Sequence, residues 1–107
     1  MTKKILNKLV RDRIPEIIEA RGQRYQTEIL SDEDYLAALD AKLNEELQEY
    51  QESKSMEELA DLLEVIRAVI TARGSTMEEV EAIRMDKAQK RGRFEKKTML
   101  SWVESDQ

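Results

Sequence analysis

Four carboxylates with helical spacing are the residues of this chain most able to do chemistry. Glu46 and Glu49 lie three positions apart beside one apolar stripe, and Glu58 and Asp61 lie three apart beside a second. Acids at i and i+3 occupy neighbouring positions on one helix face. If the two helices pack antiparallel, all four carboxylates converge beside their contact. Four acids cannot stay ionised in one cleft without a cation, so the pattern indicates a hard divalent metal.

A second interpretation needs no ligand. Acids are common on the solvated flanks of amphipathic helices in acidic proteins. Glu58 is also the fourth residue of the segment Ser55-Met-Glu-Glu58, which has the pattern of a capping box. Spacing alone therefore leaves both a metal site and a solvated helix flank open.

The composition restricts the chemistry. The 107 residues include no histidine and no cysteine, which excludes imidazole and thiolate ligands, nucleophile triads and disulfides. Oxygen ligands alone favour Mg²⁺, or Mn²⁺, over zinc. With three glycines, the chain has neither a P-loop nor a GxGxxG motif. No stretch is apolar enough for a membrane span or signal peptide, so we expect no membrane partner and a cytoplasmic location.

The charge is unevenly distributed. The net charge is −5, yet residues 28–64 carry a local balance of −11, whereas residues 84–97 carry +5 and the first 24 residues +4. Basic ends around an acidic middle suit a polyanionic, metal-bound ligand such as a nucleoside triphosphate, and equally suit charge matching between helices. Overall acidity and the lack of interleaved aromatic residues argue against a nucleic-acid partner.

Apolar periodicity and capping residues predict an all-α fold. We expect a short helix at 14–21 with Asp12 as cap, and helices at 32–53, 56–73 and 77–91 capped by Ser31, Ser55 and Thr76. Two apolar stripes define the buried faces of the two long helices: Leu36, Leu39, Leu43, Leu47 and Tyr50 on the first, and Leu59, Leu62, Leu63, Ile66, Val69 and Ile70 on the second. Val80 and Ile83 should give the last helix a buried edge.

Two segments have strand-like composition. Residues 24–30 alternate apolar and polar side chains, and residues 98–103 are apolar, so they could pair as a short peripheral β-hairpin. We expect residues 1–107 to form a single domain, since no linker or repeat interrupts them. A helical hairpin this small cannot bury both stripes alone, so we expect oligomerisation to complete a four-helix-bundle-like arrangement.

A basic segment covers the end of the last expected helix and the residues after it. Residues 86–97 bring several cations to a helix end, where the helix dipole attracts them without any ligand. Phe94 and Trp102 could stack on a nucleotide base, although aromatic residues more often belong to a core. Near the N-terminus, Arg11 and Arg13 could contact phosphate or pair with acids of the middle segment.

Taken together, these motifs resemble the MazG-like, all-α nucleoside triphosphate pyrophosphohydrolases, a superfamily that includes phosphoribosyl-ATP pyrophosphohydrolases and dimeric dUTPases. Glu45-Glu46-Leu-Gln-Glu49, followed by Glu58-Leu-Ala-Asp61, is similar to the EExxE…ExxD signature of that superfamily. The segments NKLVRDRIPEII at 7–18 and KAQKRGRF at 87–94 look like the opening and the basic C-terminal motif of its small house-cleaning branch.

The resemblance implies an enzyme that converts a nucleoside triphosphate and water to a monophosphate and pyrophosphate, as a homodimer or homotetramer. It assigns Mg²⁺ binding to Glu46, Glu49, Glu58 and Asp61, and catalytic roles to Glu45 and Glu49. Phosphate and base contacts would come from Lys87, Lys90, Arg91, Arg93, Phe94 and Trp102. Only eight residues, 50–57, separate the acid pairs, fewer than in many relatives, so the helices must turn tightly. A non-catalytic or weakly catalytic nucleotide- or metal-binding regulatory module is the alternative, and a purely structural helical adaptor is another.

Overall fold

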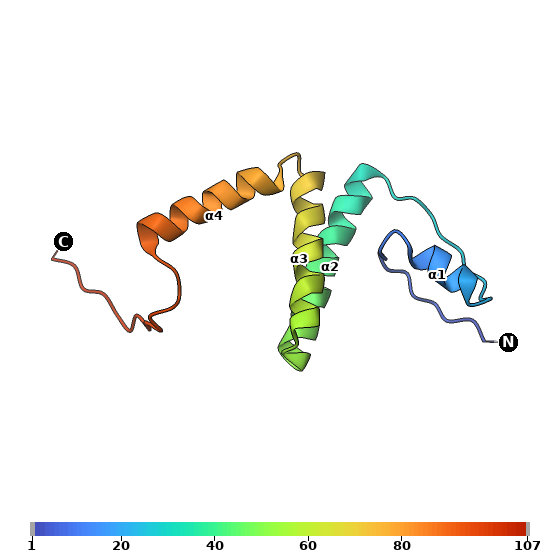
Figure 1. Cartoon of the computed structure of the whole chain (residues 1–107), viewed down its shortest axis with the longest axis horizontal. Helices are drawn as coiled ribbons and strands as arrows, with labels where there is room; N and C mark the ends of the chain where they lie inside the picture. Colours follow the sequence, from blue (N-terminus) through green and yellow to red (C-terminus); the bar gives the residue numbers. More distant parts are fainter. Residues whose placement is uncertain (1, 107) are drawn as a thin grey trace. The chain divides into compact units, whose positions relative to one another are not determined.

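The computed structural model describes residues 2–106, and within them the secondary structure is entirely helical (Figure 1). The helices are α1 (Ile14–Ala20), α2 (Asp32–Ser53), α3 (Met56–Ala72) and α4 (Met77–Arg91). The described chain divides into two units, residues 2–75 and residues 76–106, each considered by itself. Met1 and Gln107, which the sequence assigns to the N-terminal lead-in and the C-terminal tail, lie outside the described residues. The all-α prediction is confirmed, and the expectation of one domain remains a prediction.

Helices α2 and α3 form the predicted antiparallel hairpin and lie side by side (Figure 1). Ser31 and Ser55 are their N-caps: each hydroxyl accepts a hydrogen bond from the backbone N–H three residues later, at 3.2 and 3.3 Å. Lys54 is the single residue between Ser53, the last residue of α2, and Ser55, the N-cap of α3. Its backbone lies in the left-handed region at φ 59°. The predicted tight turn after Ser53 is therefore achieved by one residue in a conformation that side chains usually avoid.

The core of the hairpin is small. Among the described residues, the buried apolar side chains are Leu39 of α2 and Val65 and Ile70 of α3. The predicted stripes are correct for Leu39 and Ile70 but wrong for Leu63, which is 63% exposed, and for Leu47, which is 41% exposed. Positions seven apart share a helix face, so the face of α2 that contains Leu39 continues through Glu46 rather than Leu47.

Helix α1 follows an N-terminal segment that contains no helix or strand within residues 2–13. It begins after Arg13 without a side-chain cap, so the prediction that Asp12 caps it is wrong. Pro15 lies in the first turn, where its missing N–H costs no hydrogen bond. The helix ends at Ala20, and Gly22 at φ 73° turns the chain so that the N–H groups of Gly22 and Gln23 bond carbonyls of the last turn.

The second unit contains α4 and the chain after it. Thr76 caps α4, as predicted, by accepting a hydrogen bond from the Glu79 N–H at 3.1 Å, and the helix ends at Gly92. No residue of α4 is buried, and Ile83 is more than half exposed, so the predicted buried edge is not formed. Within residues 76–106 no second helix covers it.

The predicted β-hairpin is wrong. Residues 24–30 and 98–103 form no strand, and nearly all of their side chains are exposed. Strand-forming side chains stabilise a strand only when a partner supplies backbone hydrogen bonds, and an isolated two-stranded hairpin is marginal in water. Across residues 2–106, no helix combines the length and apolar character needed to cross a membrane.

Candidate metal centre

The hairpin brings together acids from both of its helices. One carboxylate oxygen from each of Glu46, Glu58 and Asp61 lies within 4.8 Å of the other two, and the same holds for Glu45, Glu46 and Glu49. Glu46 belongs to both groups. The four predicted metal ligands and Glu45 therefore form one acid cluster, defined here as these five residues, with Glu46 at its centre.

Glu46 is the buried charge of the hairpin. It is only 6% exposed, in contrast to every other acid among the described residues, and its Oε2 has no hydrogen-bond partner. Burial raises the pKa of Glu46 above its ordinary value, and the charge of Glu49 raises this pKa further, while Lys42 opposes both effects. A buried carboxylate oxygen without a partner is costly, so the position favours a proton or a cation.

Glu58 is free to take part in the cluster. In a full capping box, its carboxylate would accept the N–H of Ser55. Here that N–H donates instead to the Ser53 hydroxyl at 3.2 Å, and only the reverse bond, from the Glu58 N–H to the Ser55 hydroxyl, is made. The Oε2 atom of Glu58 is buried and has no hydrogen-bond partner. The capping interpretation therefore does not account for the Glu58 side chain.

Within the described chain, three basic side chains contact the acid cluster. The Lys42 ammonium lies 3.3 Å from Glu45 and 3.4 Å from Glu46. From the N-terminal segment, Lys8 lies 3.8 Å from Glu45, and Arg11 donates a 2.7 Å hydrogen bond to Asp61. The sequence interpretation missed Lys42, although its spacing of three and four residues from these two acids could have indicated it.

Five carboxylates and three basic groups leave the cluster with a formal charge of −2, which one divalent cation would balance. The available donors are carboxylate oxygens, the ligands that Mg²⁺ and Mn²⁺ prefer. Glu46 Oε2 on α2 and Glu58 Oε2 on α3 are buried without a hydrogen-bond partner, and a bound metal would give both oxygens a partner. The residues present therefore fit a hard divalent cation.

Glu45 occupies a different position from the four other acids. Its carboxylate is about one-third exposed and contacts two lysines, Lys8 and Lys42. On a helical wheel Glu45 faces away from the apolar stripe of the sequence, yet the structure places it in the acid cluster beside Glu46 and Glu49. A partly solvated acid at the rim can orient water, the role that the resemblance implies for it.

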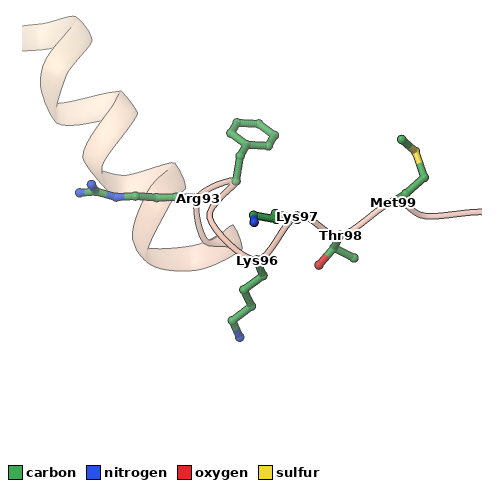
Figure 2. Close-up of a pocket in the computed structure, with 6 residues that line it drawn as sticks. Arg93, Lys96, Lys97, Thr98 and Met99 are labelled. Atoms are coloured by element: carbon green, nitrogen blue, oxygen red, sulfur yellow. The ribbon is translucent and has the colours of Figure 1, made fainter.

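The basic and aromatic residues predicted to contact substrate belong to the second unit. The Lys90 ammonium pairs with Asp86 at 3.1 Å. Phe94 is almost fully exposed, and Trp102 is about three-quarters exposed. A surface hollow is lined by residues 93, 94 and 96–99 (Figure 2), but the side chains of Arg93 and Lys96 point in different directions there. Of the predicted substrate contacts, Arg93 and Phe94 line this hollow. Lys87, Arg91 and Arg93 are exposed as well.

Part of the chain is similar to a known protein whose description states no function. A protein of Mycolicibacterium smegmatis (strain ATCC 700084 / mc(2)155), described as uncharacterized, is 61% identical over 41 residues. The match covers 38% of this chain and 42% of that protein, so the chain spans less than half of this relative's length. No protein-family model matches the chain, and no solved structure matches it. Any assignment of function therefore depends on the geometry of the acid cluster and the motifs.

Proposed function

We propose that this protein is a Mg²⁺-dependent nucleoside triphosphate pyrophosphohydrolase of the MazG-like class, which releases a nucleoside monophosphate and pyrophosphate. The observation that carries the proposal is the acid cluster, in which two helices bring five carboxylates around the buried, unsatisfied oxygens of Glu46 and Glu58. The motif resemblance at residues 45–61 supplies the reaction. A house-cleaning role in the cytoplasmic nucleotide pool is the expected setting.

Under this proposal Glu46, Glu49, Glu58 and Asp61 hold the metal. A bound Mg²⁺ would neutralise phosphate charge and make a water molecule easier to deprotonate. Glu49 and Glu45, which are less buried than Glu46, would orient the attacking water and accept its proton. Water attacks a phosphorus in line, the bond to the leaving pyrophosphate breaks, and no covalent enzyme intermediate is required.

Cationic side chains would stabilise the negative charge that develops on the leaving pyrophosphate. Lys87, Lys90, Arg91 and Arg93 are the proposed contributors from the C-terminal unit, and a second copy of the chain could supply them. Phe94 and Trp102, exposed as they are, would offer apolar surfaces for the base.

Oligomerisation is part of the proposal. The hairpin leaves Leu63 and Leu47 exposed on its helices, and it buries only three apolar side chains of the described chain. Exposed apolar side chains on two adjacent helices favour packing against another helical pair. We therefore propose a homodimer or homotetramer in which two hairpins form a four-helix arrangement.

The test is product analysis with Mg²⁺ over a panel of nucleoside triphosphates. The proposal expects monophosphate and pyrophosphate in equal amounts, with turnover lost in Asp61→Asn and retained in Glu52→Gln, an exposed acid of the same hairpin. Orthophosphate without pyrophosphate would refute the reaction. Loss of activity on metal removal, restored by Mn²⁺, would support oxygen-ligand metal binding.

One observation favours a second candidate. Arg11 and Lys42 already provide cations to Asp61 and Glu46, so these acids are partly neutralised without a metal. Such a site suits a nucleotide- or metal-binding regulatory module with weak or no turnover. Tight binding of a triphosphate without pyrophosphate release would select that candidate over the enzyme.

A further inference from the structure

The most informative contact outside the proposed metal ligands is made by the N-terminal segment. Arg11 lies in the turn that leads into α1, where its carbonyl accepts a hydrogen bond from the Ile14 N–H at 3.1 Å. This bond constrains the backbone at Arg11, and the Arg11 guanidinium donates a hydrogen bond to Asp61 of α3 at 2.7 Å. Lys8, three residues earlier in the chain, lies with its ammonium 3.8 Å from Glu45 of α2. Two cations of one segment thus contact both helices of the acid cluster.

The ion pair between Arg11 and Asp61 can be broken and replaced by other partners. The side chains of Arg11 and Asp61 are 59% and 41% exposed, and exposed ion pairs are weak because water and salt compete for both partners. Asp61 is also one of the acids that would hold a metal. A divalent cation at Asp61 would compete directly with the guanidinium for the same carboxylate oxygens.

We infer that Arg11, assisted by Lys8, is a phosphate-binding residue of the site, which pairs with the acid cluster while the metal is absent and turns to the substrate's polyphosphate when the metal binds. This inference rests on the proposed function. The guanidinium is a planar, permanently charged fork that matches phosphate geometry. Metal loading would release it at the place where the phosphates must lie, next to the metal.

The inference predicts that removing Arg11 has opposite effects on two binding equilibria. Metal alone should bind more tightly, because a competing cation is gone. Polyphosphate should bind less tightly to the metal-loaded protein, because a phosphate contact is gone. A purely structural role for Arg11 would weaken both equilibria, and a residue outside the site would change neither.

The experiment compares the full chain with its Arg11→Gln and Arg13→Gln variants. Arg13 is the matched control, two residues along the same segment, with its guanidinium 3.7 Å from Glu16 and outside the acid cluster. Free Mn²⁺ is followed by electron paramagnetic resonance during titration, and inorganic tripolyphosphate is then titrated calorimetrically into Mn²⁺-saturated protein. Circular dichroism verifies that helix content is equal in all three proteins.

For Arg11→Gln we expect Mn²⁺ affinity to rise about two- to fivefold, the range of an exposed ion pair, and tripolyphosphate affinity to fall about tenfold or more. Lys8→Gln should shift both in the same directions by less, and Arg13→Gln should shift neither. Unchanged or weaker Mn²⁺ binding in Arg11→Gln, or unchanged tripolyphosphate binding, overturns the inference alone. Absence of Mn²⁺ binding in the unmodified protein overturns the proposed function as well.

Discussion

Arg11 and Asp61, fifty positions apart in the chain, are joined by a 2.7 Å hydrogen bond between Nη2 and Oδ1. The contact ties the segment before α1 to the side of α3 that carries the acid cluster. As an exposed ion pair it contributes at most about 1 kcal/mol to folding. The contact therefore matters for the site more than for stability, because it brings a cation to one of the proposed metal ligands.

The first prediction concerns metal binding and stability. A metal that binds only the folded protein, at about 100 times its Kd, should raise the free energy of unfolding by about 2.7 kcal/mol. Thermal unfolding with and without Mg²⁺ or Mn²⁺ measures this. The gain should disappear in Glu58→Gln and persist in Glu52→Gln. An identical Tm in EDTA and in millimolar Mg²⁺ would favour the structural adaptor.

The second prediction concerns the pH dependence of the metal-free protein. The pKa of Glu46 is raised by burial and by Glu49 above its ordinary value of 4.5, so the folded state holds a proton that the unfolded chain releases. The contribution of Glu46 to the free energy of unfolding should therefore be most favourable below pH 4.5. This contribution should be lost as the pH rises through the folded-state pKa of Glu46.

Glu46→Gln removes this ionisation. Urea unfolding in EDTA from pH 4 to 8 should show the variant gaining on the unmodified protein as the pH rises and exceeding it in stability at pH 8. Glu52→Gln, on the exposed side of α2, is the control. A variant less stable than the unmodified protein at pH 8 would contradict the assignment of Glu46 as a destabilising buried charge.

The third prediction separates catalysis from folding. Glu49→Gln and Asp61→Asn each remove one charge from the acid cluster and keep the side-chain shape, so helix content should be unchanged. Pyrophosphate release should fall more than about 100-fold, because the loss of a metal ligand exceeds the effect of outer contacts on metal sites. Parallel circular dichroism and pyrophosphate assays measure both. Retained turnover in both variants would remove the cluster from the active site.

The fourth prediction concerns the turn between α2 and α3. Lys54 is left-handed at φ 59°, which glycine adopts without the steric cost that a Cβ introduces. Lys54→Gly should be more stable than Lys54→Ala by about 1 kcal/mol. Alanine is the matched control because both substitutions remove the Lys54 ammonium from its place over the Tyr50 ring. Equal urea midpoints for the two variants would contradict a strained turn.

The fifth prediction concerns assembly. Sedimentation equilibrium at micromolar concentration should give a dimer or tetramer, and Leu63→Glu should shift it toward the monomer by placing a charge on the exposed face of α3. Ile29→Glu, at an almost fully exposed position between α1 and α2, should leave the mass unchanged. A monomeric unmodified protein would refute the four-helix arrangement.

The helices were predictable because their signals are local. Ser31, Ser55 and Thr76 cap α2, α3 and α4 through bonds to residues only three positions on, and such bonds depend on the immediate sequence. The predicted strands failed for the opposite reason. A strand needs a distant partner, and the composition of residues 24–30 and 98–103 carries no information about whether one is present.

The sequence by itself determined which residues can be helical, where three of the four helices are capped, and that any metal would be held by carboxylates, because histidine and cysteine are absent. Only the tertiary structure decided that Glu46 rather than Leu47 lies on the buried face, and that Lys8 and Arg11 reach Glu45 of α2 and Asp61 of α3. A helical pattern defines a stripe only to within a residue or so. The packing of α3 against α2, and the contacts of Lys8 and Arg11 with acids of the two helices, select which side chains meet.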